Sequence, residues 1–87
     1  MNQIIATPAQ LSLVLRSVRK SQALSQVETG RRVGLLQKTV SALENHPESV
    51  TIESFFKLLS ALELEMQLSL KKSEIDSNLT KADRGEW

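Results

Sequence analysis

Hydrophobic residues first recur at helical spacing near the start of the chain. The residues of this apolar face are Leu11, Val14, Leu15 and Val18. Thr7 followed by Pro8 is a typical helix start, because a hydroxyl can cap the first N–H groups and proline is tolerated in the first turn. The cations Arg19 and Lys20 suit the dipole near the C-terminal end. The pattern therefore predicts a helix over residues 8–20.

Two short helices joined by a tight turn are predicted next. Ser25 and Glu28 form an S-x-x-E capping box. The helix that they start, over residues 26–33, ends at Gly34, because glycine readily takes the left-handed conformation of a C-cap. A third helix is predicted over residues 37–45.

A fourth helix is predicted to begin after Thr51, another hydroxyl cap. Its inner face is expected to carry Ile52, Phe55, Phe56, Leu59 and Leu62. The two successive phenylalanines should make the largest single contribution to the core, at about 1.5–3 kcal/mol per buried side chain.

The hydrophobic period changes after the fourth helix. Apolar and polar residues alternate strictly over residues 64–70, and the apolar positions are Leu64, Met66, Leu68 and Leu70. This alternation predicts a half-buried strand, the only convincing one in the chain. A lone strand leaves both edges unpaired, and the simplest remedy is the same strand of a second copy, antiparallel about a two-fold axis. The alternative is that these residues extend the fourth helix.

The composition limits the chemistry of this chain. Its 87 residues form one domain, and so small a domain is marginally stable alone. It has no cysteine and one histidine, which excludes disulfides and leaves too few ligands for a zinc site. We therefore expect no enzymatic activity, no metal and no cofactor, and we expect a partner chain to supply the missing stabilisation.

Composition and charge also bear on location and partners. No long apolar stretch or signal peptide is present, so we expect no membrane association and a cytoplasmic location. The net charge of +1 divides into +3 over residues 1–50 and −2 over residues 51–87. This division suggests two contact surfaces, although chance could produce so mild an asymmetry.

These patterns divide the chain into four parts. We expect an N-terminal arm (1–6), a helical domain (7–63), a dimerisation strand (64–70) and a flexible tail (71–87) of low hydrophobicity. The tail ends at Trp87, the only tryptophan. This residue either has no role or anchors a partner protein, since tryptophan is enriched at interface hot spots.

The second and third helices form the most informative unit. Two short helices joined through a glycine turn are typical of a helix-turn-helix, whose second helix enters the major groove of DNA. The expected base-reading residues are Gln37, Lys38, Thr39 and Ser41. Expected phosphate contacts are the terminal N–H of Gln26 and the side chains of Arg31 and Arg32. The alternative is a plain helical hairpin in which these polar residues are caps.

Residues 25–45 resemble the helix-turn-helix of the phage repressor and Cro (XRE) family. The matching residues are Gln26, Glu28, Gly34, Leu43, Glu44 and Asn45. The resemblance implies a mainly α, lambda-repressor-like bundle of four to five helices plus the C-terminal strand. It also implies a structural ion pair between Arg19 and Glu44. The chain departs from the family at Thr29-Gly30, where Leu-Ala is usual; Gly30 keeps a close helix approach, and Thr29 removes a core leucine.

Residues outside this motif resemble HipB-type antitoxins. The matching segments are Thr7–Leu11, Val18-Arg19, Phe55–Leu59, Leu62–Leu64, Met66 with Leu68, and Glu86-Trp87. The resemblance implies a homodimer joined by the C-terminal strand, which binds double-stranded operator DNA and a HipA-like serine/threonine kinase toxin. It implies that Trp87 docks on the kinase. Leu36 stands where that family can carry a basic residue, so we expect a different operator sequence.

Two other functions remain open on the residues alone. A stand-alone phage-type repressor needs the dimer and the DNA-binding helix but gives the tail no role. A helical interaction module that has lost DNA binding predicts no salt-dependent affinity for any duplex.

Overall fold

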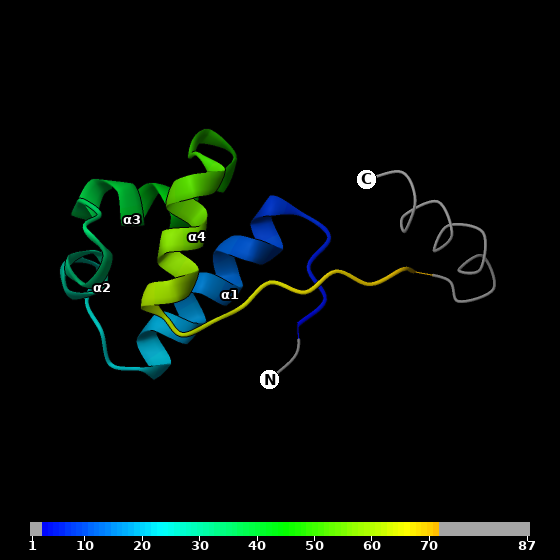
Figure 1. Ribbon diagram of the computed structural model, residues 1–87, viewed down its shortest axis with the longest axis horizontal. Helices are drawn as coiled ribbons and strands as arrows, with labels where there is room; N and C mark the ends of the chain where they lie inside the picture. The colour runs from blue at the N-terminus through cyan, green and yellow to red at the C-terminus, as the bar shows by residue number, and fades with distance from the viewer. Residues whose placement is uncertain (1–2, 72–87) are drawn as a thin grey trace, which may run out of the picture.

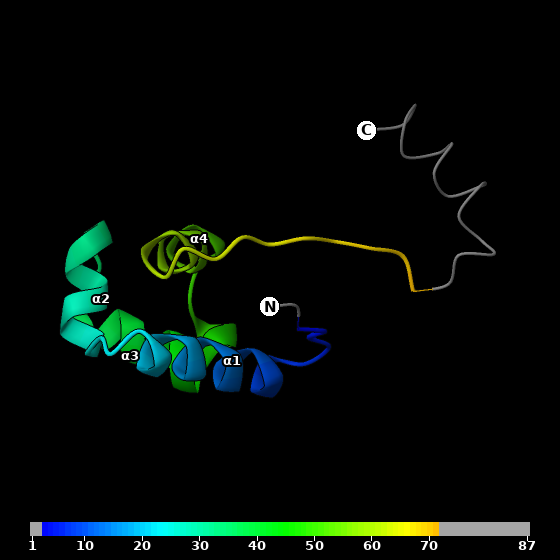
Figure 2. The ribbon, with the colours of Figure 1, turned by 90° about the horizontal axis from the view of Figure 1, so that it is seen from below.

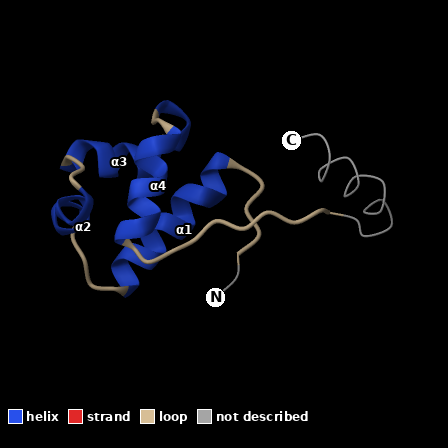
Figure 3. Ribbon diagram, viewed as in Figure 1, coloured by secondary structure: helices blue, strands red, loops and turns tan. Residues whose placement is uncertain are grey.

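The structure, a computed structural model, describes residues 3–71, and within them four α-helices surround one core (Figure 1). The elements are α1 (Pro8–Ser21), α2 (Gln26–Val33), α3 (Gln37–Asn45), the 3₁₀ turn η1 (Pro47–Ser49) and α4 (Ile52–Ala61). The mainly helical fold and the helix-turn-helix are confirmed (Figure 3). The bounds of α2 and α3 match the predictions, α1 is one residue longer, and η1 is an addition.

Local hydrogen bonds explain why α1 and α2 start where the sequence predicted. The hydroxyl of Thr7 accepts from the N–H of Gln10 at 3.2 Å, and the Gln10 amide oxygen accepts from the N–H of Thr7 at 3.1 Å. Ser25 and Glu28 exchange the same pair of bonds at 3.0 and 2.8 Å. Both are complete capping boxes, which satisfy N–H groups that a helix leaves without intrahelical partners.

The core is aliphatic and drawn from three helices. Its buried residues are Leu15, Val18, Val40, Leu43, Leu58, Leu59 and Leu62. They come from α1, α3 and α4, with Leu62 as the C-cap of α4, and residues three and four apart lie on the inward face of each helix. α2 contributes the buried Thr29 and Gly30 instead of large apolar side chains. α2 therefore lies close to the core without entering it deeply.

The prediction for the inner face of α4 is partly wrong. Ile52 is 67% exposed and Phe56 is 48% exposed, while Leu58, which the prediction left out, is fully buried. Phe55 packs only partly against the core. The helix is rotated so that positions 55, 58, 59 and 62 point inward, and the phenylalanine pair is not the centre of the core. α4 has more apolar positions than the core can use, and the surplus lies on its flank.

The two departures from the phage repressor pattern are compatible with close packing. A Cβ at Gly30 would lie 2.3 Å from the carbonyl oxygen of Leu35 and 3.2 Å from Cγ2 of Val40, so only glycine allows this approach. Thr29 is completely buried, and its hydroxyl donates to the carbonyl of Ser25 at 2.8 Å. The buried hydroxyl thus has a partner, which keeps its burial from being costly.

The segment after α4 is extended but is not assigned as a strand. Glu63, with φ 59°, turns the chain away from α4, and the N–H of Leu64 then donates to the carbonyl of Leu59 at 2.8 Å. Residues 65–71 make no backbone hydrogen bond to any other described residue. The segment runs away from the helices in both views (Figures 1 and 2). The helical alternative for residues 64–70 is wrong, and their pairing with a second copy stays a prediction.

Two predictions lie partly or wholly outside the described residues. The N-terminal arm is described from Gln3 onward, and of the tail only Lys71 is described, so Trp87 lies outside. Within residues 3–71 no helix is long and apolar enough to cross a membrane.

Candidate nucleic-acid interface

A buried ion pair fixes α3 against α1. Glu44 is 1% exposed, and its Oε1 accepts from Nη2 of Arg19 at 3.1 Å while its Oε2 accepts from Nε of the same side chain. Nη1 of Arg19 donates to the carbonyl of Leu24 at 2.8 Å, at the entry to α2. The hydrogen bond to Glu44 raises the pKa of the Arg19 guanidinium, so this group stays charged. The implied Arg19–Glu44 pair is confirmed, and it joins α1 to α3 and to the loop that leads into α2.

Arg16 adds a second clamp that sequence reasoning missed. Its Nη2 donates to Oδ1 of Asn45 at 2.6 Å and to the carbonyl of Glu44 at 3.3 Å. Its Nε also lies 3.8 Å from Oε1 of Glu44. One signal was available, because Arg16 stands three residues before Arg19 and so shares its side of α1. The C-terminal end of α3 is thus tied to α1 by two arginines.

The side chain of Gln26 connects this buried pair to the start of α3. Its Nε2 donates to Oε1 of Glu44 at 3.1 Å, and its Oε1 accepts from Nε2 of Gln37 at 2.6 Å. The sequence predicted only the backbone N–H of Gln26 as a phosphate donor. The structure shows that its side chain positions Gln37. The Gln37 amide keeps its own oxygen and one N–H for an external partner, the set that pairs with N6 and N7 of adenine.

The outward face of α3 carries most of the predicted base-reading residues. Val40, Leu43 and Glu44 are buried, and at 100° per residue Lys38 lies nearly opposite them. Gln37 and Lys38 are exposed, whereas Thr39 and Ser41 are half-buried. Of the polar set, the first two are therefore the most accessible.

Ser41 is held by its neighbour one turn later. Nδ2 of Asn45 donates to the Ser41 carbonyl at 2.8 Å and to its Oγ at 3.3 Å. The hydroxyl accepts this bond and keeps its own proton to donate outward. Ser41 is thus oriented by the same asparagine that Arg16 holds.

The two arginines of α2 have different surroundings. Nη1 of Arg32 donates to the carbonyl of Ala61 at 3.0 Å, which joins the end of α2 to the end of α4. Arg31 is exposed and makes no hydrogen bond or ion pair to another described residue. Arg31 is therefore the better placed of the two for a phosphate, and Arg32 has a structural task.

The start of α2 carries a perturbed carboxylate. The hydrogen bond from the backbone N–H of Ser25, followed by that from its hydroxyl, lowers the pKa of Glu28. Glu28 is thus held charged in the first turn of α2, where a negative charge suits the helix dipole. The cap fixes where α2 begins and so where Gln26 lies.

α3 is the helix without a side-chain cap. Its N-cap is Leu36, which makes no capping hydrogen bond and is 64% exposed. The preceding Leu35 turns inward against the core, and its N–H donates to the carbonyl of Gly30 at 2.9 Å. The turn between α2 and α3 therefore directs one leucine inward and the next outward.

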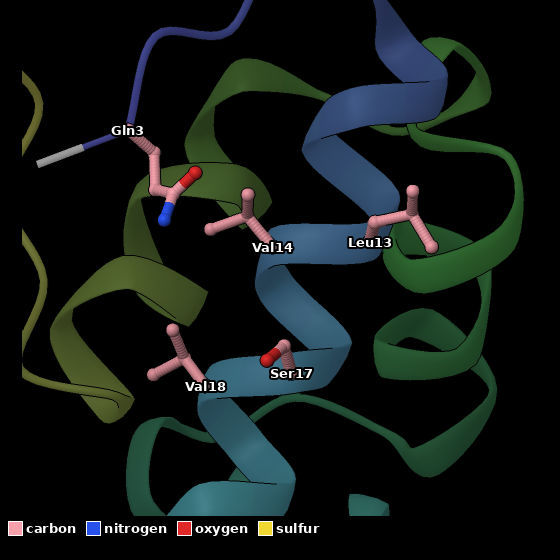
Figure 4. A pocket seen from close by; sticks show the side chains of 5 residues that line it. All are labelled: Gln3, Leu13, Val14, Ser17 and Val18. Atoms are coloured by element: carbon pink, nitrogen blue, oxygen red, sulfur yellow. The ribbon is translucent and has the colours of Figure 1, made fainter.

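The described residues also form a hollow away from this surface. A shallow hollow beside α1 is lined by Gln3, Leu13, Val14, Ser17 and Val18 (Figure 4). None of these side chains is an acid or a base. Among residues 3–71 no three histidine or acidic side chains are grouped so as to hold a metal ion.

Comparison with known proteins identifies the family. A helix-turn-helix family model matches residues 15–68, more than half of the chain. The antitoxin HipB of Escherichia coli strain K12 is 35% identical over 85 residues, covering 98% of this chain and 96% of that protein. The antitoxin HipB of the O6:H1 strain CFT073 is 38% identical over 66 residues, covering 76% and 70%.

Solved structures agree in fold and in sequence. A chain of a HipA–HipB–O2–O3 complex superposes with a TM-score of 0.77 at 38% identity, over 82% of this chain and 100% of that one. A chain of a HipB–O4 20mer complex gives the same TM-score, identity and coverage. The two curated relatives are antitoxins, as the resemblance to HipB-type antitoxins implied. The chain therefore belongs to the HipB family of helix-turn-helix antitoxins.

Proposed function

We propose that this protein is an antitoxin and autorepressor that binds a palindromic operator in double-stranded DNA. The observation that carries the proposal is the chain of hydrogen bonds from buried Glu44 through Gln26 to exposed Gln37. This chain holds a base-reading amide in place before DNA arrives, so less conformational entropy is lost on binding. A neighbour of known structure, the HipB–O4 20mer complex, supports the same use of the fold.

Lys38 and Ser41 complete the proposed reading face, with Thr39 at its edge. Lys38 can donate to guanine and the threonine methyl can pack on thymine. Arg31 and the N–H of Gln26 are proposed phosphate contacts, which fix position and carry no sequence information. Arg32 is a secondary candidate for a phosphate contact, because one of its N–H groups already donates to the carbonyl of Ala61 and only the others are free for the DNA backbone. Because this function acts on the chromosome, we place the protein in the cytoplasm.

Binding to duplex DNA from the region upstream of the gene tests the proposal. We expect affinity to fall with rising salt, because phosphate contacts release counterions. Gln37→Ala and Lys38→Ala should each weaken specific binding by about tenfold or more, since a good base contact contributes about 1–3 kcal/mol. Lys57→Ala, an exposed lysine on α4, is the matched control and should change little. Full affinity in both α3 variants would remove α3 from the interface.

We further propose a homodimer joined through residues 64–70. Met66, Leu68 and Leu70 are 47%, 91% and 42% exposed, and the backbone from residue 65 onward has no partner among the described residues. Ile52 and Phe56 add exposed apolar surface on α4. Pairing of the two strands would satisfy the backbone and cover apolar side chains together. The dimer would place its two α3 helices in successive major grooves, about 34 Å apart.

A HipA-like kinase is the proposed protein partner, supported by the HipA–HipB–O2–O3 structure among the neighbours. Trp87 is the proposed anchor, as a large apolar side chain at the end of a polar tail. Co-purification with the kinase encoded beside the gene tests this, with full-length protein and a variant that lacks Trp87. We expect the truncated variant to recover less kinase. Equal recovery would remove the anchor, and no recovery with either protein would favour a stand-alone repressor.

A further inference from the structure

Leu36 is an apolar residue where the other helices have polar caps. Thr7, Ser25 and Thr51 cap α1, α2 and α4 with their hydroxyls. At α3 the N-cap is Leu36, and no side chain of the described residues caps that helix. Leucine is among the residues least suited to an N-cap, because it offers no acceptor to the first N–H groups. The helix that would contact DNA therefore forgoes a stabilising cap that the other three have.

Packing does not explain this leucine. Leu36 is 64% exposed, whereas the adjacent Leu35 packs against the core and occupies the position from which a hydrophobic staple reaches Val40. The core is thus served by Leu35, and Leu36 points outward. An exposed leucine at a cap position contributes neither burial nor a hydrogen bond to the free chain.

The position of Leu36 indicates which group it contacts. It directly precedes Gln37 and Lys38, the most accessible residues of the proposed reading face, at the end of α3 that enters the groove. Base edges in the major groove carry mostly hydrogen-bonding groups, and the one apolar substituent that projects from them is the C5-methyl group of thymine. An exposed apolar side chain next to polar base-reading residues is suited to pack on that methyl group.

We propose that Leu36 packs on the C5-methyl of a thymine in each half-site and so helps to determine which operator the protein binds. This inference rests on the proposed DNA-binding function and adds a specificity residue to it. The alternative is that Leu36 contacts a partner protein, and the experiment distinguishes the two.

Replacing thymine with deoxyuridine tests the contact directly, because the change removes only the methyl group. The probes are duplexes selected from a random pool by the wild-type protein, with each thymine replaced in turn in both half-sites. We expect one position at which the wild type loses roughly fourfold in affinity per half-site, the loss expected for one methyl group returned to water. Leu36→Ala should bind the thymine duplex more weakly and should not distinguish it from the deoxyuridine duplex.

Leu13→Ala is the matched control, because Leu13 is 66% exposed on α1 and has no place on the reading face. It should keep the full difference between the two duplexes. A second variant, Leu36→Ser, restores a hydroxyl cap and should raise the melting temperature while it removes the same discrimination. Opposite effects on stability and on reading cannot arise from simple misfolding.

The outcomes separate the two proposals. If deoxyuridine costs the wild type and Leu36→Ala equally at every position, the thymine contact is overturned and DNA binding stands. If Leu36→Ala binds DNA as the wild type does but co-purifies less kinase, Leu36 contacts a protein and the inference is likewise overturned. If the wild type selects no duplex at all, the proposed function fails and this inference fails with it.

Discussion

Two regions of the molecule differ in how their polar and apolar groups are satisfied. One is the corner formed by α1, α2 and α3, and the other is the open face, which comprises α4 and residues 64–71. In the corner, every buried charge has a partner, and Arg19 and Glu44 meet within one chain. On the other face, Leu68 is 91% exposed and Ile52 is 67% exposed. The buried charges of the first region are paired within a single copy, whereas the second region combines exposed apolar side chains with backbone groups that have no partner among the described residues.

This difference fits the two regions to the different partners proposed for them. A polar network that ends on an exposed amide is suited to hydrogen-bonding base edges, whose geometry must be met closely. An extended apolar segment with free backbone groups is suited to another strand. The division follows the change from a basic to an acidic half along the sequence.

The largest expected effect is in the corner, from Glu44→Ala. The change leaves the guanidinium of Arg19, which is 9% exposed, without its partner. Removing one member of a buried pair costs about 3–5 kcal/mol, and urea denaturation at a fixed protein concentration should show it. Glu48→Ala removes an exposed carboxylate and should stay within about 0.5 kcal/mol of the wild type. A loss below about 1 kcal/mol for Glu44→Ala would mean that the network does not stabilise the corner.

The open face is tested by Leu68→Lys. Burying a leucine contributes about 1.5–3 kcal/mol, so a lysine here should shift a dimer toward monomer by at least about tenfold. Sedimentation equilibrium measures the shift. Gln67→Lys adds the same charge to the alternate side of the segment, and it should change the dimer much less. If both variants sediment as the wild type does, residues 64–70 are not the dimer contact.

The smallest expected effect is a pH dependence at the α2 capping box. Hydrogen bonds from Ser25 lower the pKa of Glu28 below its ordinary value of 4.5. The stabilisation is therefore complete above pH 4.5 and is lost as pH falls through the lower pKa of the folded state. The free energies of unfolding of wild type and Glu28→Gln should differ at pH 6, and the difference should shrink as the pH falls below 4.5.

Ser25→Ala provides the second variant for this cap. Loss of the hydroxyl, which accepts from the backbone N–H of Glu28, should cost about 0.5–2 kcal/mol near neutral pH. It should also weaken the pH dependence, because the Ser25 side chain helps to lower the pKa of Glu28. A wild type and a Glu28→Gln variant that stay equally far apart from pH 6 to pH 3 would rule out the charged cap.

The sequence predicted the fold best where the cause is local. The bounds of α2 and α3 follow from Ser25, Glu28 and Gly34, whose effects extend over only a few residues. The rotation of α4 was not predictable, because Ile52 and Phe56 fit an apolar face as well as the residues that are buried. Periodicity cannot tell a core position from an interface position when both are apolar.

In the candidate site, too, the sequence predicted local features but not contacts between helices. The reading residues of α3 could be named from one motif, and Arg19–Glu44 from a family resemblance. The links from Arg16 to Asn45 and from Gln26 to Glu44 span 29 and 18 residues, and they depend on how helices pack against each other. Contacts of this range need the tertiary structure, because helical spacing relates only residues three or four apart.

The spacing of half-sites tests the central claim most directly, because it requires both regions at once. Affinity is measured for an operator duplex and for the same duplex with about five extra base pairs, half a helical turn, between its half-sites. If residues 64–70 join two copies whose α3 helices occupy successive major grooves, the insertion should reduce affinity toward the nonspecific level, by about a thousandfold or more. Unchanged affinity for the lengthened duplex would contradict the claim.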